Sequence, residues 1–296
     1  MLKKRAMPTA QVGDVRIAYE TFGDPSAPPV LLIMGLGSQM LAWRGGFCRQ
    51  IAKQGFRVIR YDNRDIGLSS RIAAGITNPV LTLTRRRLGQ PVAPPYTLKH
   101  MADDAIGLMD ALGLPSAHLV GASMGGMIAQ LCAIHHRPRV RSLTSMMSST
   151  GDRDLPKPGW KTRYGFMRSM PDVPEAQVER LVSLRRLVGS SHFFDEEEIR
   201  AYFAKVVARS ADRTGVPRQA LALLCSGSRR RALSRLRVPT LVLHGMDDRL
   251  LPPAHGVRTA ETIPAAKLQL IPRLGHDLPR PMWADLASRV VEHIGA

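Results

Sequence analysis

Short continuous runs of apolar residues alternate along the chain with longer segments in which apolar residues recur at helical spacing. The short runs predict strands buried on both faces of a sheet. These strands are expected at 29–33, 57–61, 118–121, 140–147, 238–244 and 267–271, with an alternating edge strand at 15–20. Helices are expected at 47–54, 98–112, 124–136 and 283–293. Because strands and helices alternate with short connections, we expect a largely parallel sheet covered by helices on both faces.

The pattern changes between residues 151 and 235, where strand-like runs are absent and helical segments follow one another. The clearest of these helices begins at Asp195 and has three glutamates in its first turn. Carboxylates at a helix start cap free N–H groups and complement the helix dipole, so we interpret the acidic run as a cap rather than a metal site. We therefore expect a sheet domain of residues 1–150 and 236–296 with a helical insertion at 151–235.

The length and composition fit this arrangement. A chain of 296 residues, 44% hydrophobic, can bury the core of one α/β domain with an insertion. No apolar run is long enough to span a bilayer, and the basic start lacks a following apolar segment, so we expect neither a membrane span nor a secretory signal. Cys48, Cys132 and Cys225 have no metal-type spacing and predict free thiols, which is consistent with the cytoplasm. The proline-rich stretch 78–95 predicts a surface loop.

The net charge of +18 raises the question of nucleic acid or an anionic surface as a partner. The arginines are spread over the whole chain, with short runs only at 85–87 and 229–231. Aromatic residues make up 5% of the chain and do not alternate with basic residues, which argues against base stacking. We therefore expect a basic enzyme without a nucleic-acid partner.

Candidate chemistry first enters at Ser123, between the apolar run that ends at Gly121 and the helical segment that begins at Met124. Glycines stand two residues before and two residues after this serine. A strand turns into a helix this sharply only where the flanking residues lack side chains, and the serine is then held exposed in a strained conformation. The helix start offers free N–H groups to a developing oxyanion. A glycine-rich turn also serves packing or phosphate binding, so the downstream residues decide between these roles.

A serine nucleophile needs a histidine base, and the histidine needs a carboxylate that fixes its tautomer. Asp247 and Asp248 follow the strand that ends at His244, and His276 follows the last strand. In a parallel sheet both loops lie at the edge that carries Ser123, and the chain order Ser, Asp, His fits this arrangement. Among nine histidines, only His276 lies in a glycine-led loop after a strand, whereas His244 is expected to brace its own loop. On these grounds either aspartate can be the acid.

Three segments together resemble the α/β-hydrolase family, and within it small carboxylesterases with a helical cap similar to the aclacinomycin methylesterases. The segments are Asp-x-Arg-x-x-Gly-x-Ser at 62–69, the run from His244 to Pro252, and Gly-His-Asp-Leu-Pro at 275–279. The resemblance extends from about residue 12 to residue 293. It implies a mostly parallel eight-stranded sheet with helices on both faces and an inserted helical cap.

The resemblance also assigns roles to individual residues. It selects Asp248 as the acid and gives the segment 62–69 a structural role. It implies an oxyanion hole made by the backbone N–H groups of Leu36 and Met124. The chain departs from the family pattern here, because Met34 stands before Gly35 where many members have histidine.

Taken together, these features predict a serine hydrolase that cleaves carboxylic esters through an acyl-enzyme. Ser123 is the expected nucleophile, His276 the base and Asp248 the acid. This mechanism implies no metal and no organic cofactor, and its expected partner is a small-molecule ester. The same triad can instead serve a cofactor-free perhydrolase or haloperoxidase, or hydrolysis of lactones, thioesters or carbon–carbon bonds. An alternative of another class is a basic module that binds nucleic acid or anions on a hydrolase scaffold without activity.

Overall fold

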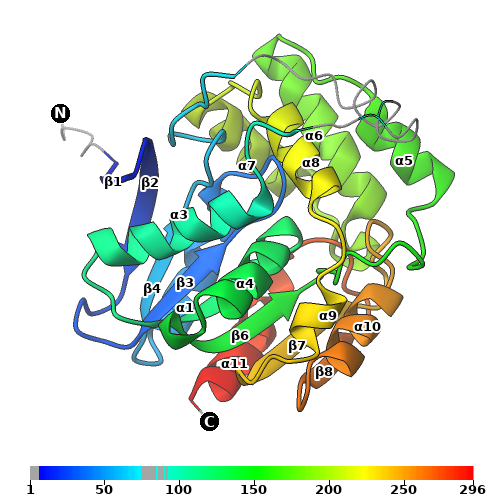
Figure 1. The fold of residues 1–296 in the computed structure, drawn as a ribbon. Coiled ribbons are helices and arrows are strands. Elements are labelled where there is room, and N and C mark those ends of the chain that lie inside the picture. Colours follow the sequence, from blue (N-terminus) through cyan, green and yellow to red (C-terminus); the bar gives the residue numbers. More distant parts are fainter. Residues whose placement is uncertain (1–6, 75–84, 86–89, 91–92, 296) are drawn as a thin grey trace.

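The computed structural model describes residues 7–74, 85, 90 and 93–295 of the chain. Its strands form one sheet in the order β1-β2-β4-β3-β5-β6-β7-β8 (Figure 1). They are β1 (Thr9–Val12), β2 (Val15–Phe22), β3 (Pro29–Ile33), β4 (Arg57–Tyr61), β5 (Ala117–Ala122), β6 (Val140–Met146), β7 (Thr240–Gly245) and β8 (Lys267–Ile271). β2 runs antiparallel to β1 and β4, and the neighbouring pairs from β4 to β8 are parallel. The expected mostly parallel eight-stranded sheet is confirmed, although the hydrophobic pattern missed the short edge strand β1.

Helices cover both faces of this sheet. They are α1 (Gly45–Ala52), α3 (Leu98–Ala111), α4 (Met124–His135), α10 (Ala254–Thr262) and α11 (Trp283–Ile294). On β3, Leu31 and Ile33 pack into a core with α3 and α4, whereas Val30 and Leu32 pack into a second core with α1 and α11. Burial on both faces explains why the inner strands are continuous apolar runs rather than alternating ones.

Between β6 and β7 the chain forms helices without strands. They are α5 (Trp160–Met167), α6 (Pro174–Val188), α7 (Glu196–Arg209), α8 (Val216–Cys225) and the short α9 (Arg230–Leu233). A separate apolar cluster, which includes Leu181 on α6 and Phe203 on α7, joins two of them. The side chain of Asp195 accepts a hydrogen bond from the Glu198 N–H at 3.0 Å, as expected of a helix cap. In Figure 1, α5 to α8 lie together at one end of the molecule, beyond the sheet.

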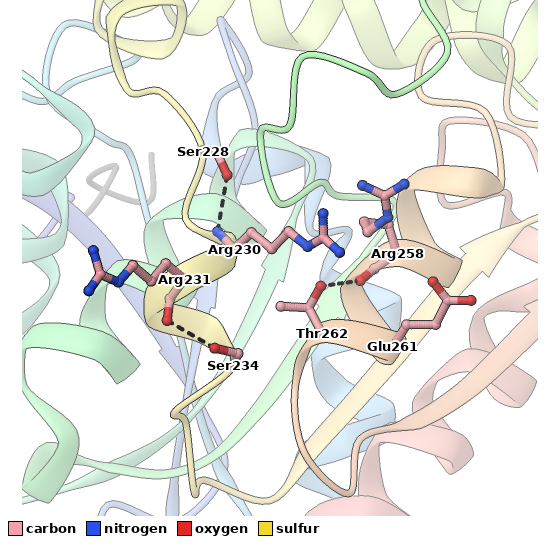
Figure 2. A pocket seen from close by; sticks show the side chains of 7 residues that line it. All are labelled: Ser228, Arg230, Arg231, Ser234, Arg258, Glu261 and Thr262. Carbon is pink, nitrogen blue, oxygen red and sulfur yellow. Dashed lines mark hydrogen bonds between the residues drawn. The ribbon is translucent and has the colours of Figure 1, made fainter.

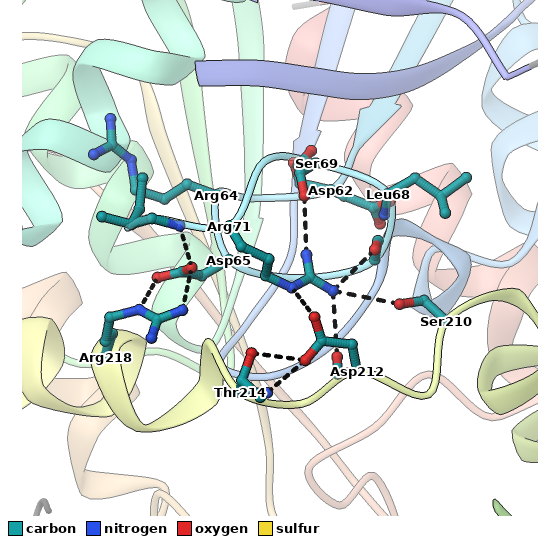
Figure 3. Close-up of polar contacts among 12 residues, drawn as sticks. Asp62, Arg64, Asp65, Leu68, Ser69, Arg71, Ser210, Asp212, Thr214 and Arg218 are labelled. Atoms are coloured by element: carbon teal, nitrogen blue, oxygen red, sulfur yellow. Dashed lines mark hydrogen bonds and ion pairs between the residues drawn. The ribbon is translucent and has the colours of Figure 1, made fainter. Parts of the chain in front are cut away.

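The loop after β4 ties the sheet to these helices (Figure 3). Within the loop, the Asp62 carboxylate accepts hydrogen bonds from the N–H groups of Met40 at 2.7 Å and Leu68 at 2.9 Å. Asp65 forms a two-point ion pair with Arg218 of α8, with distances of 2.8 and 2.9 Å. These bonds occupy the acidic groups of the segment 62–69, in keeping with the structural role that the resemblance implies.

The stretch 78–95, for which a surface loop is expected, lies mostly outside the described residues. Within the described ranges, no helix combines the length and the apolar character that a membrane crossing requires. The three cysteines are free; Cys48 and Cys132 are buried and Cys225 is half-buried.

The ion pair between Asp65 and Arg218 yields a test of how firmly the helices are attached. Both side chains are almost fully buried, so removing the cation leaves an uncompensated carboxylate. We expect Arg218→Ala to lower the free energy of unfolding by about 3–5 kcal/mol. In contrast, Lys99→Ala breaks an exposed pair with Asp103 on α3 and should cost about 0.3–0.5 kcal/mol. Urea denaturation measures both, and equal small losses would contradict the prediction.

Candidate active site

Ser123 occupies the turn between β5 and α4 and has a left-handed backbone conformation, with φ 56° and ψ −123°. Its N–H donates to the Met146 carbonyl at 2.9 Å, and its carbonyl accepts a hydrogen bond from the Ser148 hydroxyl at 2.8 Å. A residue with a side chain is strained in this conformation, so it persists only where the surroundings impose it. The predicted sharp turn is present, and bonds from β6 and the loop after it hold it in place.

The two flanking glycines allow the backbone to close around this turn. A β-carbon at Gly121 would overlap the carbonyl of Gly125, and one at Gly125 would overlap the carbonyl of Ile33. The strand, the start of α4 and the end of β3 are therefore in backbone contact. Any side chain at either position would push Ser123 away from the neighbouring loop.

The loop after β3 lies directly against Ser123. A β-carbon at Gly35 would be 3.0 Å from the β-carbon of Ser123. Within the described part of the chain, neither the Leu36 N–H nor the Met124 N–H donates a hydrogen bond. The next amide, that of Gly37, donates to the Gln219 side chain of α8 at 2.9 Å. Two free N–H groups thus stand beside the serine, which is the arrangement that an oxyanion hole requires.

Asp248 and His276 form a close pair at the same edge of the sheet. His276 Nδ1 lies 2.7 Å from an oxygen of the Asp248 carboxylate, whose other oxygen accepts the N–H groups of Leu250 and Leu251 at 2.9 and 2.8 Å. Burial alone would raise the pKa of the Asp248 carboxyl, but the charge of His276, the bond to it and the Leu251 amide outweigh burial and lower it. Asp248 is buried, whereas Asp247 is exposed, so the geometry singles out Asp248.

The sheet register brings Ser123 and His276 to one edge, but the two side chains are not hydrogen-bonded. Ala122 and Met146, the ends of β5 and β6, are aligned with each other and with Leu243 of β7, and Gly245 at the end of β7 is aligned with the end of β8. Among the residues that the structure describes, neither the Ser123 hydroxyl nor Nε2 of His276 has a hydrogen-bond partner. Such contacts are often long without substrate and shorten when it binds.

His244 lies behind the acid. It is fully buried, its Nε2 lies 2.8 Å from the Leu251 carbonyl, and its distance to the Asp248 carboxylate is 3.6 Å. Burial lowers the pKa of His244, so the ring stays neutral and donates to that carbonyl. It braces the loop that carries Asp248, as the sequence led us to expect.

The histidine loop is bonded to the end of α6, and the sequence analysis missed these contacts. Asp277 accepts the N–H of Ser190 at 2.9 Å and its hydroxyl at 2.5 Å. The Ser190 hydroxyl also accepts the Gly275 N–H at 2.8 Å, and the His276 N–H donates to the Val188 carbonyl at 2.8 Å. Asp277 stands next to the candidate base in the sequence, which is a signal that could have been used. Ser190 carries no comparable local signal.

A hollow lies on the surface between α9 and α10 (Figure 2). It is lined by Ser228, Arg230, Arg231, Ser234, Arg258, Glu261 and Thr262. Arg258 is engaged by Asp152 and Asp154, at 3.0 Å each. The hollow contains none of the residues predicted to carry the chemistry. In the described ranges, no group of three His, Cys, Asp or Glu side chains is arranged to hold a metal ion.

The contacts of Ser190 predict a local stability effect. Ser190→Ala removes a buried hydroxyl that serves both Asp277 and the Gly275 amide, so we expect a loss of about 1–3 kcal/mol in the free energy of unfolding. Hydrogen exchange at Gly275 should also become faster, because that amide loses its acceptor. Ser183→Ala on the exposed side of α6 is the matched control. Unchanged exchange at Gly275 in the Ser190 variant would contradict the prediction.

The lowered pKa of Asp248 predicts how stability depends on pH. In the unfolded chain the Asp248 carboxyl has a pKa of about 3.9, and in the folded chain its pKa is lower. Ionised Asp248 therefore stabilises the fold fully above the unfolded pKa. This contribution is lost as the pH falls through the folded pKa. The difference in unfolding free energy between the wild type and Asp248→Asn should therefore shrink below about pH 4. Urea denaturation at a series of pH values on either side of about 4 measures this difference. A difference that does not change with pH would refute the lowered pKa of Asp248.

Comparison with known proteins agrees with the fold and with the segments that suggested the family. The model of the alpha/beta hydrolase fold family matches residues 28–279. The chain is 30% identical to rhodomycin D methylesterase DauP of Streptomyces sp. (strain C5), over 98% of this chain and 99% of that protein. It is also 30% identical to rhodomycin D methylesterase DnrP of Streptomyces peucetius, with the same coverage of both chains.

The structure also resembles that of the meta-cleavage product hydrolase CumD from Pseudomonas fluorescens IP01. The two superpose with a TM-score of 0.76 over 97% of each chain, at 24% sequence identity, which is a likeness of fold alone. The family model spans most of the chain, and the methylesterases match it nearly from end to end. The predicted resemblance is confirmed, and the chain belongs to the alpha/beta hydrolase fold family.

Proposed function

We propose that the protein is a serine esterase that cleaves carboxylic esters through an acyl-enzyme. Ser123 is the nucleophile, His276 the general base and Asp248 the acid that orients it. The observation that carries the proposal is the 2.7 Å contact between His276 Nδ1 and the buried Asp248, at the sheet edge that also carries the strained Ser123. The names of the two methylesterases support an ester as the substrate.

The chemistry divides into two steps. Ser123 Oγ attacks the ester carbonyl carbon while its proton passes to His276 Nε2, the ring nitrogen that does not face Asp248. The C–O bond of the ester then breaks, and the alcohol leaves with that proton, which yields the acyl-enzyme. In the second step, water gives a proton to His276 and attacks the acyl carbon. Ser123 recovers its proton as the carboxylic acid departs.

The Leu36 and Met124 amides would stabilise the oxyanion in both steps. Both N–H groups are without an acceptor in the described chain, and the loop of Leu36 touches Ser123 through Gly35. Met124 is the first residue of α4, where free N–H groups and the helix dipole favour negative charge. The donors are main-chain groups, so the Met34 that replaces the family's histidine leaves them in place. Loss of one such donor typically lowers turnover about 10²–10³-fold.

Substrate entry would involve the helices between β6 and β7. We propose that residues 151–235 form a cap over the site, because α6 and α8 bond directly to the loops of His276 and Gly37. The free thiols support a reducing, cytoplasmic location.

We further propose that nucleic acid is not a partner. The arginines are spread over the whole chain, and aromatic residues make up only 5% of it, so the sequence offers little for stacking with bases.

The proposal is tested by removing the nucleophile. Ser123→Ala should lower hydrolysis of a short-chain 4-nitrophenyl ester by about 10⁶-fold and abolish labelling by a fluorophosphonate. Ser234→Ala, at an exposed serine of the surface hollow, should keep both activity and labelling. Retained labelling in the folded Ser123 variant would refute the nucleophile. An assay with lactones, thioesters and peroxide beside the ester would separate esterase action from the other reactions of the same triad.

A further inference from the structure

Arg213, in the loop between α7 and α8, has no ion-pair partner among the residues that the structure describes. Its Nε is buried and makes no hydrogen bond, and its side chain forms no ion pair within the described residues. Burial is the main cause that lowers its pKa, and the Arg71 charge adds to it. Withdrawing a cation from water without a counter-charge costs free energy. A bound anion would offset this cost at Arg213.

The neighbouring buried arginines do not share this condition. Arg218 pairs with Asp65 at 2.8 Å, and Arg209 lies 2.7 Å from the Asp62 carboxylate. Arg229 donates to the Gln130 side chain at 3.0 Å and to the Ser149 carbonyl at 2.8 Å. The arginines on either side of Arg213 thus have partners, although Nε of Arg209 also lacks a hydrogen bond, whereas no carboxylate pairs with Arg213 within the described residues.

The guanidinium lies against the loop that carries the proposed oxyanion donor. Its Nη2 is 3.1 Å from the position that a β-carbon at Gly37 would occupy. Gly37 directly follows Leu36, and Gly35 of the same loop contacts Ser123. Arg213 is therefore separated from the nucleophile by one short loop.

Arg213 is one of four arginines around the buried Tyr202. Tyr202, on α7, has Arg44, Arg185, Arg60 and Arg213 as its charged neighbours, and burial is the main cause that raises the pKa of its phenol. The guanidinium of Arg44 stacks on the Tyr202 ring at 3.4 Å, and its nearest carboxylate, Glu198, is 3.9 Å away. Arg185 forms an ion pair with Asp277 at 3.1 Å. The phenol stays protonated, so Tyr202 offers a hydrogen-bond donor near the cation of Arg213.

We propose that Arg213 binds a carboxylate of the ester substrate, with Arg44 and Tyr202 completing the anion subsite. A guanidinium matches a carboxylate through two parallel N–H bonds, and such a bond is strongest in a site that is partly withdrawn from water. The favoured substrates are then esters with a free acid group on the acyl or the alcohol side. This inference rests on the proposed esterase function and adds the substrate class.

The test compares charged and neutral esters of the same shape. On the acyl side the pair is mono-4-nitrophenyl glutarate and 4-nitrophenyl pentanoate. On the alcohol side the pair is 4-carboxyphenyl pentanoate and its methyl ester. The wild type should show a higher kcat/KM for the charged member of at least one pair. Arg213→Gln should lower that preference about 10- to 100-fold and leave the neutral ester nearly unchanged. Arg213→Lys should retain part of it.

The matched control is Arg231→Gln, at an exposed arginine of the surface hollow, which should leave the preference intact. A wild type that favours the neutral ester in both pairs overturns the subsite, whether or not the Arg213 variants fold. An equal loss on charged and neutral esters in Arg213→Gln also overturns it, because that result assigns Arg213 to loop structure. Failure of the wild type to hydrolyse any of the four esters would instead count against the proposed function.

Discussion

The backbone contact between β5, the start of α4 and the end of β3 is the constraint on which the site depends. Gly121 and Gly125 permit this contact because a β-carbon at either position would overlap a carbonyl group. The contact holds Ser123 at φ 56°, and the bonds to Met146 and Ser148 keep it there. A strained residue at the apex of a turn keeps its hydroxyl clear of the sheet, and the free amides of the helix start lie beside it. The same glycines therefore set both the position of Ser123, the proposed nucleophile, and the electrostatics around it.

The helices between β6 and β7 contribute to the geometry of the site. Gln219 of α8 holds the amide next to Leu36, and Ser190, after α6, holds the loop of His276 through Gly275 and Asp277. A change in the packing of these helices would move the proposed oxyanion donor Leu36 and the proposed base His276 together. Preorganised donors are effective because they do not need to rearrange during the reaction, so this attachment is relevant to catalysis as well as to stability.

Part of the arginine content has a structural role, although neutral ion pairs do not account for the net charge of +18. Many arginines pair with acids or carbonyls across elements, as Arg64 does with Asp104 and Arg218 with Asp65. These buried pairs connect loops to helices, and each pair is neutral as a whole. Arg213 differs because its guanidinium is left open beside the active-site loop. Net charge alone therefore does not identify a partner; the position of the unpaired cation is more informative than the total.

The sequence by itself determined the elements whose physics is local. Apolar runs marked the inner strands, the flanking glycines marked the turn at Ser123, and strand polarity placed the loops of Asp248 and His276 at one edge. It did not reveal β1, which is short and lies at the sheet edge, and spacing alone left Asp247 and Asp248 undecided. Burial separates the two aspartates, and burial is a tertiary property. The bonds from Ser190 to Asp277 and from Gly37 to Gln219 join residues 87 and 182 positions apart. Only the folded chain decides such contacts, because no local pattern records which distant side chain will meet a given amide.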